Sequence, residues 1–221
     1  MIRPKEEKID DRFIGRHFQI KFNPNDMNYY LKDLGHGFGT FIKILDLTEI
    51  KNNFLLSIGE NYIVFTLGIE EEMIINEHIS NNEDKEYNDL INLKIFSGNI
   101  RHGKLSFSPK QSPFIIGRSS DCEVIIDDNM LSRFHCTIKF IENKWYILDG
   151  IIDKKTNKSK NSTNGSWKYA FEDTVIVGGM TFKANHNLFI CFFLNNKKIY
   201  IYNYYNLLFI VNKMFLIFVV V

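Results

Sequence analysis

Short runs in which apolar and polar residues alternate recur along most of the chain, and they constrain the fold more than any other feature. Phe18–Phe22 is the first such run, and Ile91–Phe96 is a later one. A period of two residues is typical of a strand with one buried face. Turn-forming clusters such as Asn23–Asp26 separate the runs. No amphipathic helical pattern interrupts them, so we predict an all-β fold of the sandwich type.

The same criteria place further strands along the whole chain. They are predicted at Tyr29–Leu34, Thr40–Leu45, Phe54–Ile58, Tyr62–Leu67, Leu105–Phe107, Phe114–Ile116, Val124–Ile126, Cys136–Phe140, Trp145–Leu148, Thr174–Val177, Thr181–Lys183 and Leu188–Phe193. Residues 69–90 are acidic and polar instead. We interpret them as a solvated linker with one helical turn near Met73–His78.

Composition limits the classes of function. The 221 residues are 45% hydrophobic, which is enough for one large domain or two small ones. A formal net charge of +1 provides no field that would attract nucleic acid, so we expect no nucleic-acid contact and only a local anion site. Three cysteines without a CxxC spacing indicate no metal, no disulfide and a reducing intracellular compartment, nuclear or cytoplasmic. We expect no cofactor.

Three short clusters have the side chains that an anion site needs. Arg118 follows Gly117 at the end of an apolar run, Ser132 stands just before a strand, and Thr163 lies in a later loop. A phosphorylated side chain carries nearly two negative charges, which a guanidinium and short hydroxyl donors can hold. Each cluster alone has an ordinary explanation as a surface charge, a cap or a hairpin turn. Their occurrence in one ordered set is more specific.

That order, Gly-Arg, then Ser-Arg-x-His, then Ser-x-Asn-Gly, resembles the forkhead-associated (FHA) domain, a family that binds phosphothreonine peptides. The resemblance covers about 91–194, where Leu93–Gly98 and Gly103–Leu105 also resemble the first hairpin of the family. It implies a β-sandwich of about eleven strands whose loops hold the peptide at one end. It also implies a non-catalytic adaptor whose partner is a phosphothreonine-containing protein.

The resemblance assigns roles to particular residues. The phosphopeptide-binding set would be Arg118, Ser132, Arg133, Thr163 and Asn164. Gly117, His135 and Gly165 would support the site structurally, and Met130 is the candidate for reading the residue three after the phosphothreonine. The usual Asn-Gly-Thr is replaced by Asn164-Gly165-Ser166, a mild change.

An internal repeat accompanies this module. Tyr30–Gly35 resembles Tyr146–Gly150, Phe38–Phe41 resembles Asn164–Trp167, and the closing strands Tyr62–Leu67 and Thr181–Asn185 also correspond. The first copy lacks its opening strands and replaces the peptide-binding Asn by Phe38, so we expect it to be degenerate. The predicted division is a flexible lead-in at 1–13, a partial degenerate FHA-like module at 14–68, the linker at 69–90, the FHA domain at 91–194 and a tail at 195–221.

The apolar tail leaves three alternatives. Residues 200–221 could form a membrane anchor, but Lys213 and three asparagines interrupt the run. We favour an additional packed strand or helix, or a mispredicted exon end.

Two other functions compete with phosphopeptide binding. A scaffolding sandwich would bind protein independently of phosphate. An enzyme could pair Ser132 with His135 as nucleophile and base, yet no G-x-S-x-G elbow, P-loop or HExxH motif occurs, so we expect no enzymatic activity.

Overall fold

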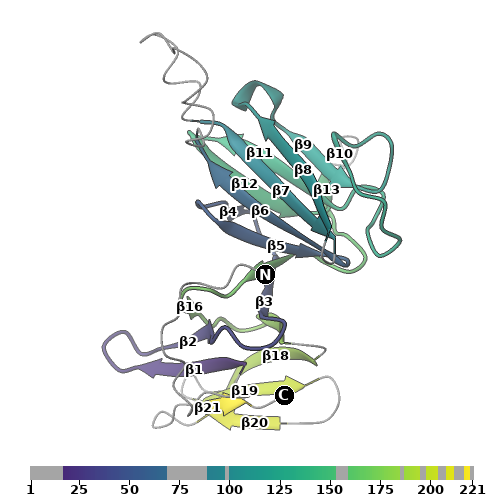
Figure 1. Cartoon of the computed structure of the whole chain (residues 1–221). Helices are drawn as coiled ribbons and strands as arrows, with labels where there is room; N and C mark the ends of the chain where they lie inside the picture. Colours follow the sequence, from purple (N-terminus) through teal and green to yellow (C-terminus); the bar gives the residue numbers. More distant parts are fainter. Residues whose placement is uncertain are drawn as a thin grey trace. The chain divides into compact units, whose positions relative to one another are not determined.

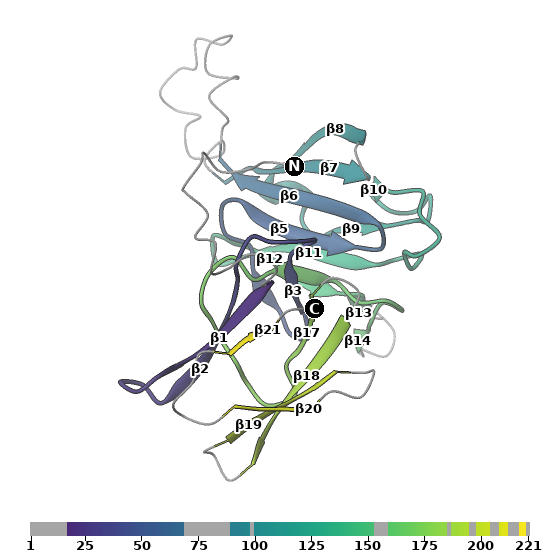
Figure 2. The same cartoon turned by 60° about the horizontal axis from the view of Figure 1, so that its bottom comes forward.

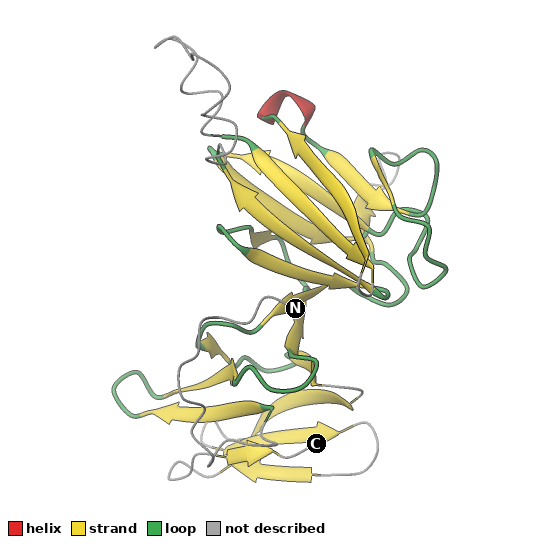
Figure 3. Ribbon diagram, viewed as in Figure 1, coloured by secondary structure: helices red, strands yellow, loops and turns green. Residues whose placement is uncertain are grey.

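The computed structural model describes residues 17–68, 89–97, 100–152, 159–184, 187–194, 198–203, 208–211 and 217–219. Figure 3 shows that strands dominate these residues, with one short 3-10 helix, η2 (Pro109–Gln111), that sequence patterning did not predict. The all-β prediction is confirmed. The predicted lead-in at 1–13, nearly all of the linker and the turn at Met73–His78 lie outside the described residues.

The chain forms two compact units that interleave in sequence. Residues 44–168 form one, called here the central unit, and residues 1–43 together with 169–221 form the other, the terminal unit. In Figure 1 the colour gradient makes this visible, because the blue strands β5 and β6 lie with teal strands while the purple β1 and β2 lie with yellow-green ones.

Two antiparallel sheets make up the central unit. The first has the order β15-β5-β6-β7-β8, and the second has the order β10-β9-β11-β12-β4, in which only β9 and β10 run parallel. Their bounds are β4 (Thr48–Glu49), β5 (Phe54–Ile58), β6 (Asn61–Leu67), β7 (Ile91–Ser97), β8 (Ile100–Phe107), β9 (Phe114–Gly117), β10 (Val124–Ile125), β11 (Cys136–Ile141), β12 (Lys144–Asp149) and β15 (Trp167–Tyr169). A small extra pair joins β13 (Ile151–Ile152) to β14 (Ser159–Lys160).

Alternating residues of these sheets form one core. Leu56, Ile63 and Leu93 from the first sheet pack in the same buried cluster as Ile138 and Ile147 from the second. Each such side chain, when fully buried, contributes about 1.5–3 kcal/mol through the hydrophobic effect. This packing confirms the sandwich, and it fixes the strand ends from which the site loops emerge.

The terminal unit has two sheets and a separate core. Their orders are β16-β2-β1-β21 and β20-β19-β18-β17-β3. The bounds are β1 (Phe18–Asn23), β2 (Asn28–Asp33), β3 (Thr40–Lys43), β16 (Thr174–Val175), β17 (Thr181–Ala184), β18 (Asn187–Leu194), β19 (Lys198–Asn203), β20 (Leu208–Val211) and β21 (Ile217–Val219). Phe18 lies at the centre of its core, with its ring centroid 5.0 Å from that of Phe182 and 5.4 Å from that of Phe189.

Three strands of the tail belong to this unit. β19 pairs with β18, β20 with β19, and β21 with β1. In the described part of the tail, these pairings agree with the alternative of additional packed strands. Within the described part of the chain, no helix has the length and hydrophobicity needed to cross a bilayer.

This grouping differs from the division predicted from the sequence. Strand β6 pairs with β7 over seven positions, from Asn61 opposite Ser97 to Leu67 opposite Ile91, so residues of the first copy belong to the same sheet as residues 91–107. Figure 2 shows β5, β6 and β7 side by side. Alternation identifies a strand and its buried face, but both copies have the same alternation. It therefore leaves open which copy a strand will pair with.

Candidate anion-binding site

The sandwich brings the Gly-Arg and Ser-Arg-x-His clusters together through strand pairing. Strand β9 pairs with β11, with Ile116 opposite Cys136. Beyond the last pair, the backbone N–H of Arg118 donates to the carbonyl of Ser132 at 3.2 Å. The side chain of Arg118 is exposed, and Ser132 is half-buried. The guanidinium and the hydroxyl therefore come from directly neighbouring backbone segments.

Close backbone approach explains the glycine at 117. A Cβ atom built there would lie 2.3 Å from the carbonyl oxygen of Arg133 and 3.0 Å from the backbone nitrogen of His135. Both neighbours are main-chain atoms, which cannot move aside as a flexible side chain could. Gly117 thus lets the loop before β11 lie directly against the end of β9.

Side chains connect this loop to the third cluster. The Ser132 hydroxyl accepts a hydrogen bond from the backbone N–H of Thr163 at 2.9 Å, and it donates to the Thr163 hydroxyl at 3.2 Å. Both residues are at the surface, with Thr163 exposed. Three sequence-predicted clusters, separated by up to 45 positions between Arg118 and Thr163, thereby meet at one end of the sandwich.

Asn164 connects the same two loops from the other side. Its side-chain amide donates to the carbonyl of Met130 at 2.7 Å. Because a carbonyl can only accept, this bond fixes the amide nitrogen toward Met130 and leaves the amide oxygen to accept a hydrogen bond. Gly165 follows with φ +77°, a left-handed conformation that glycine adopts without strain.

His135 braces the site from within. It is fully buried, its Nδ1 accepts the backbone N–H of Ser132 at 3.1 Å, and its Nε2 lies 3.2 Å from the carbonyl of Gly165. The two contacts require a neutral ring with its proton on Nε2. Burial lowers the pKa of His135, which favours that neutral form. His135 contacts the backbone of Ser132 and not its hydroxyl.

Sequence reasoning missed a buried carboxylate that holds the third loop. Asp149, at the end of β12, accepts hydrogen bonds from the hydroxyls of Ser162 and Ser166, both at 2.7 Å, and from the backbone N–H of Ser162 at 3.1 Å. The Ser162 hydroxyl in turn accepts the N–H of Gly165 at 2.9 Å. The only signal for Asp149 was its place in the repeat, next to Gly150.

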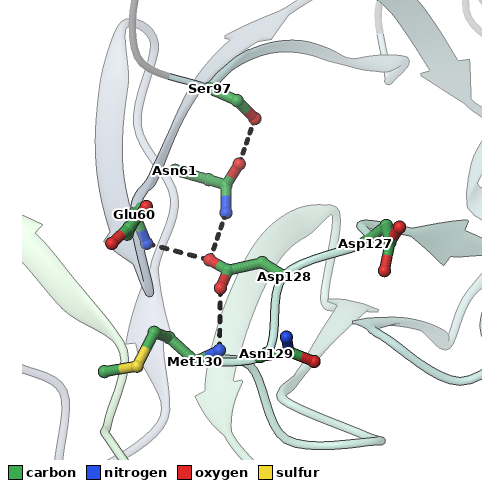
Figure 4. A pocket seen from close by; sticks show the side chains of 7 residues that line it. All are labelled: Glu60, Asn61, Ser97, Asp127, Asp128, Asn129 and Met130. Atoms are coloured by element: carbon green, nitrogen blue, oxygen red, sulfur yellow. Dashed lines mark hydrogen bonds between the residues drawn. The ribbon is translucent and has the colours of Figure 1, made fainter.

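A second missed carboxylate holds the loop of Met130. Asp128 accepts the backbone N–H of Met130 at 2.7 Å, the backbone N–H of Glu60 at 2.9 Å and the side-chain amide of Asn61 at 2.7 Å. Asn61 also accepts a hydrogen bond from Ser97 (Figure 4). The turn between β5 and β6 is therefore bound to the loop that carries Met130 and leads to Ser132.

A surface hollow of about 500 Å³ lies beside Met130 (Figure 4). It is lined by Glu60, Asn61, Ser97, Asp127, Asp128, Asn129 and Met130. The Met130 side chain is 49% exposed, so it is free to contact a ligand. Among the residues that the structure describes, no group of histidine, cysteine, aspartate and glutamate side chains could hold a metal ion.

Hydrogen bonds join the loops that carry the predicted site residues, and Arg118 takes part through its backbone N–H. Arg133 is exposed, and its carbonyl accepts the N–H of Ser119 and the thiol of Cys122, so its backbone is fixed while its side chain faces solvent. The loops joined in this way carry two exposed cationic side chains and two hydroxyls, all of which are hydrogen-bond donors. This combination suits an oxyanion with several acceptor oxygens.

Comparison with known proteins agrees with this geometry. The family model for the FHA domain matches residues 114–167. The chain is 37% identical to serine/threonine-protein kinase RAD53 of Saccharomyces cerevisiae over 62 residues. These residues make up 28% of this chain and 8% of that kinase. No solved structure shows a significant match. The matched segment runs from β9 to the start of β15 and includes all three clusters, so the part of the chain that forms the candidate site is the part that is similar to the FHA domain.

Proposed function

We propose that the central unit binds phosphothreonine peptides as a non-catalytic adaptor in protein–protein signalling. The observation that supports this most directly is the pair of hydrogen bonds between Ser132 and Thr163, next to the backbone contact of Arg118 with Ser132. These bonds join the loops that carry the three proposed phosphate ligands, which supports the proposal.

Binding needs little rearrangement of these groups. Ser132 keeps the N–H of Thr163 as a donor to its oxygen, so its own hydrogen can turn from Thr163 to a phosphate oxygen. Only the weak 3.2 Å hydroxyl–hydroxyl contact is given up. The guanidinium of Arg118 then supplies the charge-assisted bonds, and Arg133 lies beside the phosphate or faces the peptide.

The peptide backbone would be held by Asn164. Its amide nitrogen is committed to Met130, which directs the amide oxygen outward as an acceptor for a peptide N–H. Met130, at the rim of the hollow, would contact the residue three after the phosphothreonine.

The geometry disfavours hydrolysis by Ser132. A nucleophilic serine needs a base that accepts its hydroxyl proton. Here Nδ1 of His135 is occupied by the backbone N–H of Ser132, and the ring is fully buried behind the loop. His135 therefore positions the loop instead of activating the hydroxyl.

A pair of peptides that differ only by phosphorylation of one threonine tests the proposal. Because the partner is unidentified, a degenerate phosphothreonine library supplies the peptide, and calorimetry measures the affinity of the full chain. Each hydrogen bond to a charged group contributes about 1.5–3 kcal/mol, so we expect Arg118→Ala to weaken binding about 10- to 100-fold. Lys139→Ala, which removes the same charge from the middle of β11, should leave the affinity within about twofold.

Equal affinity of the wild-type chain for phosphorylated and unphosphorylated peptides would refute the proposal. It would instead support a scaffolding sandwich that binds independently of phosphate. Phosphoserine peptides measured in parallel decide whether threonine is preferred.

A further inference from the structure

The two units have the same strand arrangement although their strands come from different parts of the chain. In one sheet of each unit, the neighbouring strands β4-β12-β11-β9 of the central unit correspond to β16-β2-β1-β21 of the terminal unit. Likewise β15-β5-β6-β7-β8 corresponds to β3-β17-β18-β19-β20. Each unit is therefore a complete sandwich of the same kind.

The registers of the closing strands are equivalent. Glu49 lies opposite Tyr146 in the central unit, and Val175 lies opposite Tyr30 in the terminal unit. One residue further on, the N–H of Ile50 donates to the carbonyl of Trp145 at 2.8 Å. The equivalent hydrogen bond of the terminal unit, from the N–H of Ile176 to the carbonyl of Tyr29, is also 2.8 Å long. The agreement extends to the individual hydrogen bond.

The other sheets agree in the same way. Leu56 of β5 lies opposite Lys168, and Phe182 of β17 lies opposite Ile42. This register equates β5 with β17 and β6 with β18, whereas the sequence comparison had aligned Tyr62–Leu67 with the segment that begins at Thr181. Asn53 and Gly179, which precede β5 and β17 at equivalent positions, both have positive φ, +62° and +83°.

The units divide the chain at equivalent points of the repeat. The boundaries fall between Lys43 and Ile44 and between Lys168 and Tyr169. Just beyond them, the N–H of Ile44 donates to Ser166 in the central unit, and the N–H of Ala170 donates to Thr40 in the terminal unit, both at 2.9 Å. Each repeat thus gives its front strands to one unit and its closing strands to the other.

We propose that this chain is a pair of FHA-like sandwiches that have exchanged their closing strands within one molecule. The central unit completes the second repeat with β4, β5 and β6 of the first. The terminal unit completes the first repeat with β16, β17 and β18 of the second, and the tail strands β19, β20 and β21 take the places that β7, β8 and β9 occupy in the central unit.

The exchange has a consequence for phosphopeptide binding, which rests on the function proposed above. Glu60 and Asn61, which hold Asp128 beneath the Met130 loop, belong to the exchanged segment. The binding domain is therefore 44–168 and not 91–194. In the terminal unit, Gly37 and Phe38 stand at the positions of Thr163 and Asn164, so these two proposed ligand residues have no counterpart of the same type there.

Paired cysteines in the full chain test the exchange. The bond between Ile50 and Trp145 makes the neighbouring Glu49/Tyr146 pair a non-hydrogen-bonded one, whose Cα atoms lie about 4.5 Å apart in an antiparallel sheet, a distance that permits a disulfide. The same holds for Tyr30/Val175. We expect E49C/Y146C and Y30C/V175C to form intramolecular disulfides under mild oxidation.

The matched controls use the same four positions in the other combination. If each repeat closed on its own strands, E49C/Y30C and Y146C/V175C would cross-link instead. The native cysteines, Cys122, Cys136 and Cys191, are buried, and peptide mapping identifies the linked pair. Cross-linking of the control pairs, or disulfides between two chains on a non-reducing gel, would overturn the proposal.

Phosphopeptide binding of the oxidised proteins provides an independent readout. Oxidised E49C/Y146C should bind with the affinity of its reduced form, and a loss of binding on oxidation would show that the exchanged arrangement is not the active one. If no variant, reduced or oxidised, binds phosphopeptide, the proposed function fails while the cross-linking pattern still decides the exchange.

Discussion

Replacing Asp149 by alanine should destabilise the central unit more than any single exposed change at the binding loops. Asp149 is 3% exposed and accepts three hydrogen bonds. The donors are the Ser162 hydroxyl, the Ser166 hydroxyl and the backbone N–H of Ser162. Removing it leaves the fully buried Ser166 hydroxyl without that acceptor. It also frees the turn before Gly165.

The magnitude follows from the kind of bond. Hydrogen bonds to a charged group contribute about 1.5–3 kcal/mol each, and Ser162 is half-buried, so water can partly replace its two bonds. Taking the lower figure for all three gives a loss of about 4.5 kcal/mol in the free energy of unfolding. Total stabilities are about 5–15 kcal/mol, so this loss is large.

Tryptophan fluorescence during urea unfolding measures the loss selectively. The chain has two tryptophans, Trp145 and Trp167, and both are buried in the central unit. Asp127→Ala, an exposed aspartate in the same unit, is the control and should change stability by less than about 0.5 kcal/mol. A loss below about 1 kcal/mol for Asp149→Ala would refute the view that this carboxylate organises the loop.

Three further predictions follow from buried groups. Gly117→Ala should lower the free energy of unfolding by about 1–3 kcal/mol, because the new methyl group meets main-chain atoms of Arg133 and His135. In Gly178→Ala the nearest atom to the new methyl group would be 3.8 Å away, so this control variant should be nearly neutral in denaturant unfolding. Burial holds the pKa of His135 below its usual value of about 6.5, so the unfolded chain takes up the proton first. Stability should therefore be full above about pH 6.5 and decline as the pH falls through the lower folded-state pKa, and His135→Asn should show a flatter profile in urea titrations. Burial raises the pKa of Cys136, so iodoacetamide should not alkylate it in the native chain, as mass spectrometry would detect; rapid native labelling would contradict its burial.

Part of this structure could be predicted from the sequence because its signals are local. Alternation located β1, β7 and most other strands, and the order of Arg118, Ser132 and Thr163 indicated one shared site. The roles of Asp128 and Asp149 could not be recognised, because the sequence does not distinguish a carboxylate that accepts hydrogen bonds from neighbouring loops from a solvated one. The sequence also did not indicate that β6 pairs with β7. Residues 68–90 separate the two strands, and the strands of both repeats have the same alternation, so either repeat could have supplied the partner.

The interleaving of the units affects how the protein is made. The front strands at 18–43 emerge from the ribosome before the strands of the central unit, yet the strands that complete their sheets start only at Thr174. The central unit, by contrast, has all of its strands once synthesis has passed Trp167. Because domains fold as units and N-terminal segments normally fold first, we expect this order to be inverted here. We therefore expect the unit that carries the candidate anion site to fold first, while the apolar faces of β1, β2 and β3 stay uncovered until β16 and the later strands have been synthesised.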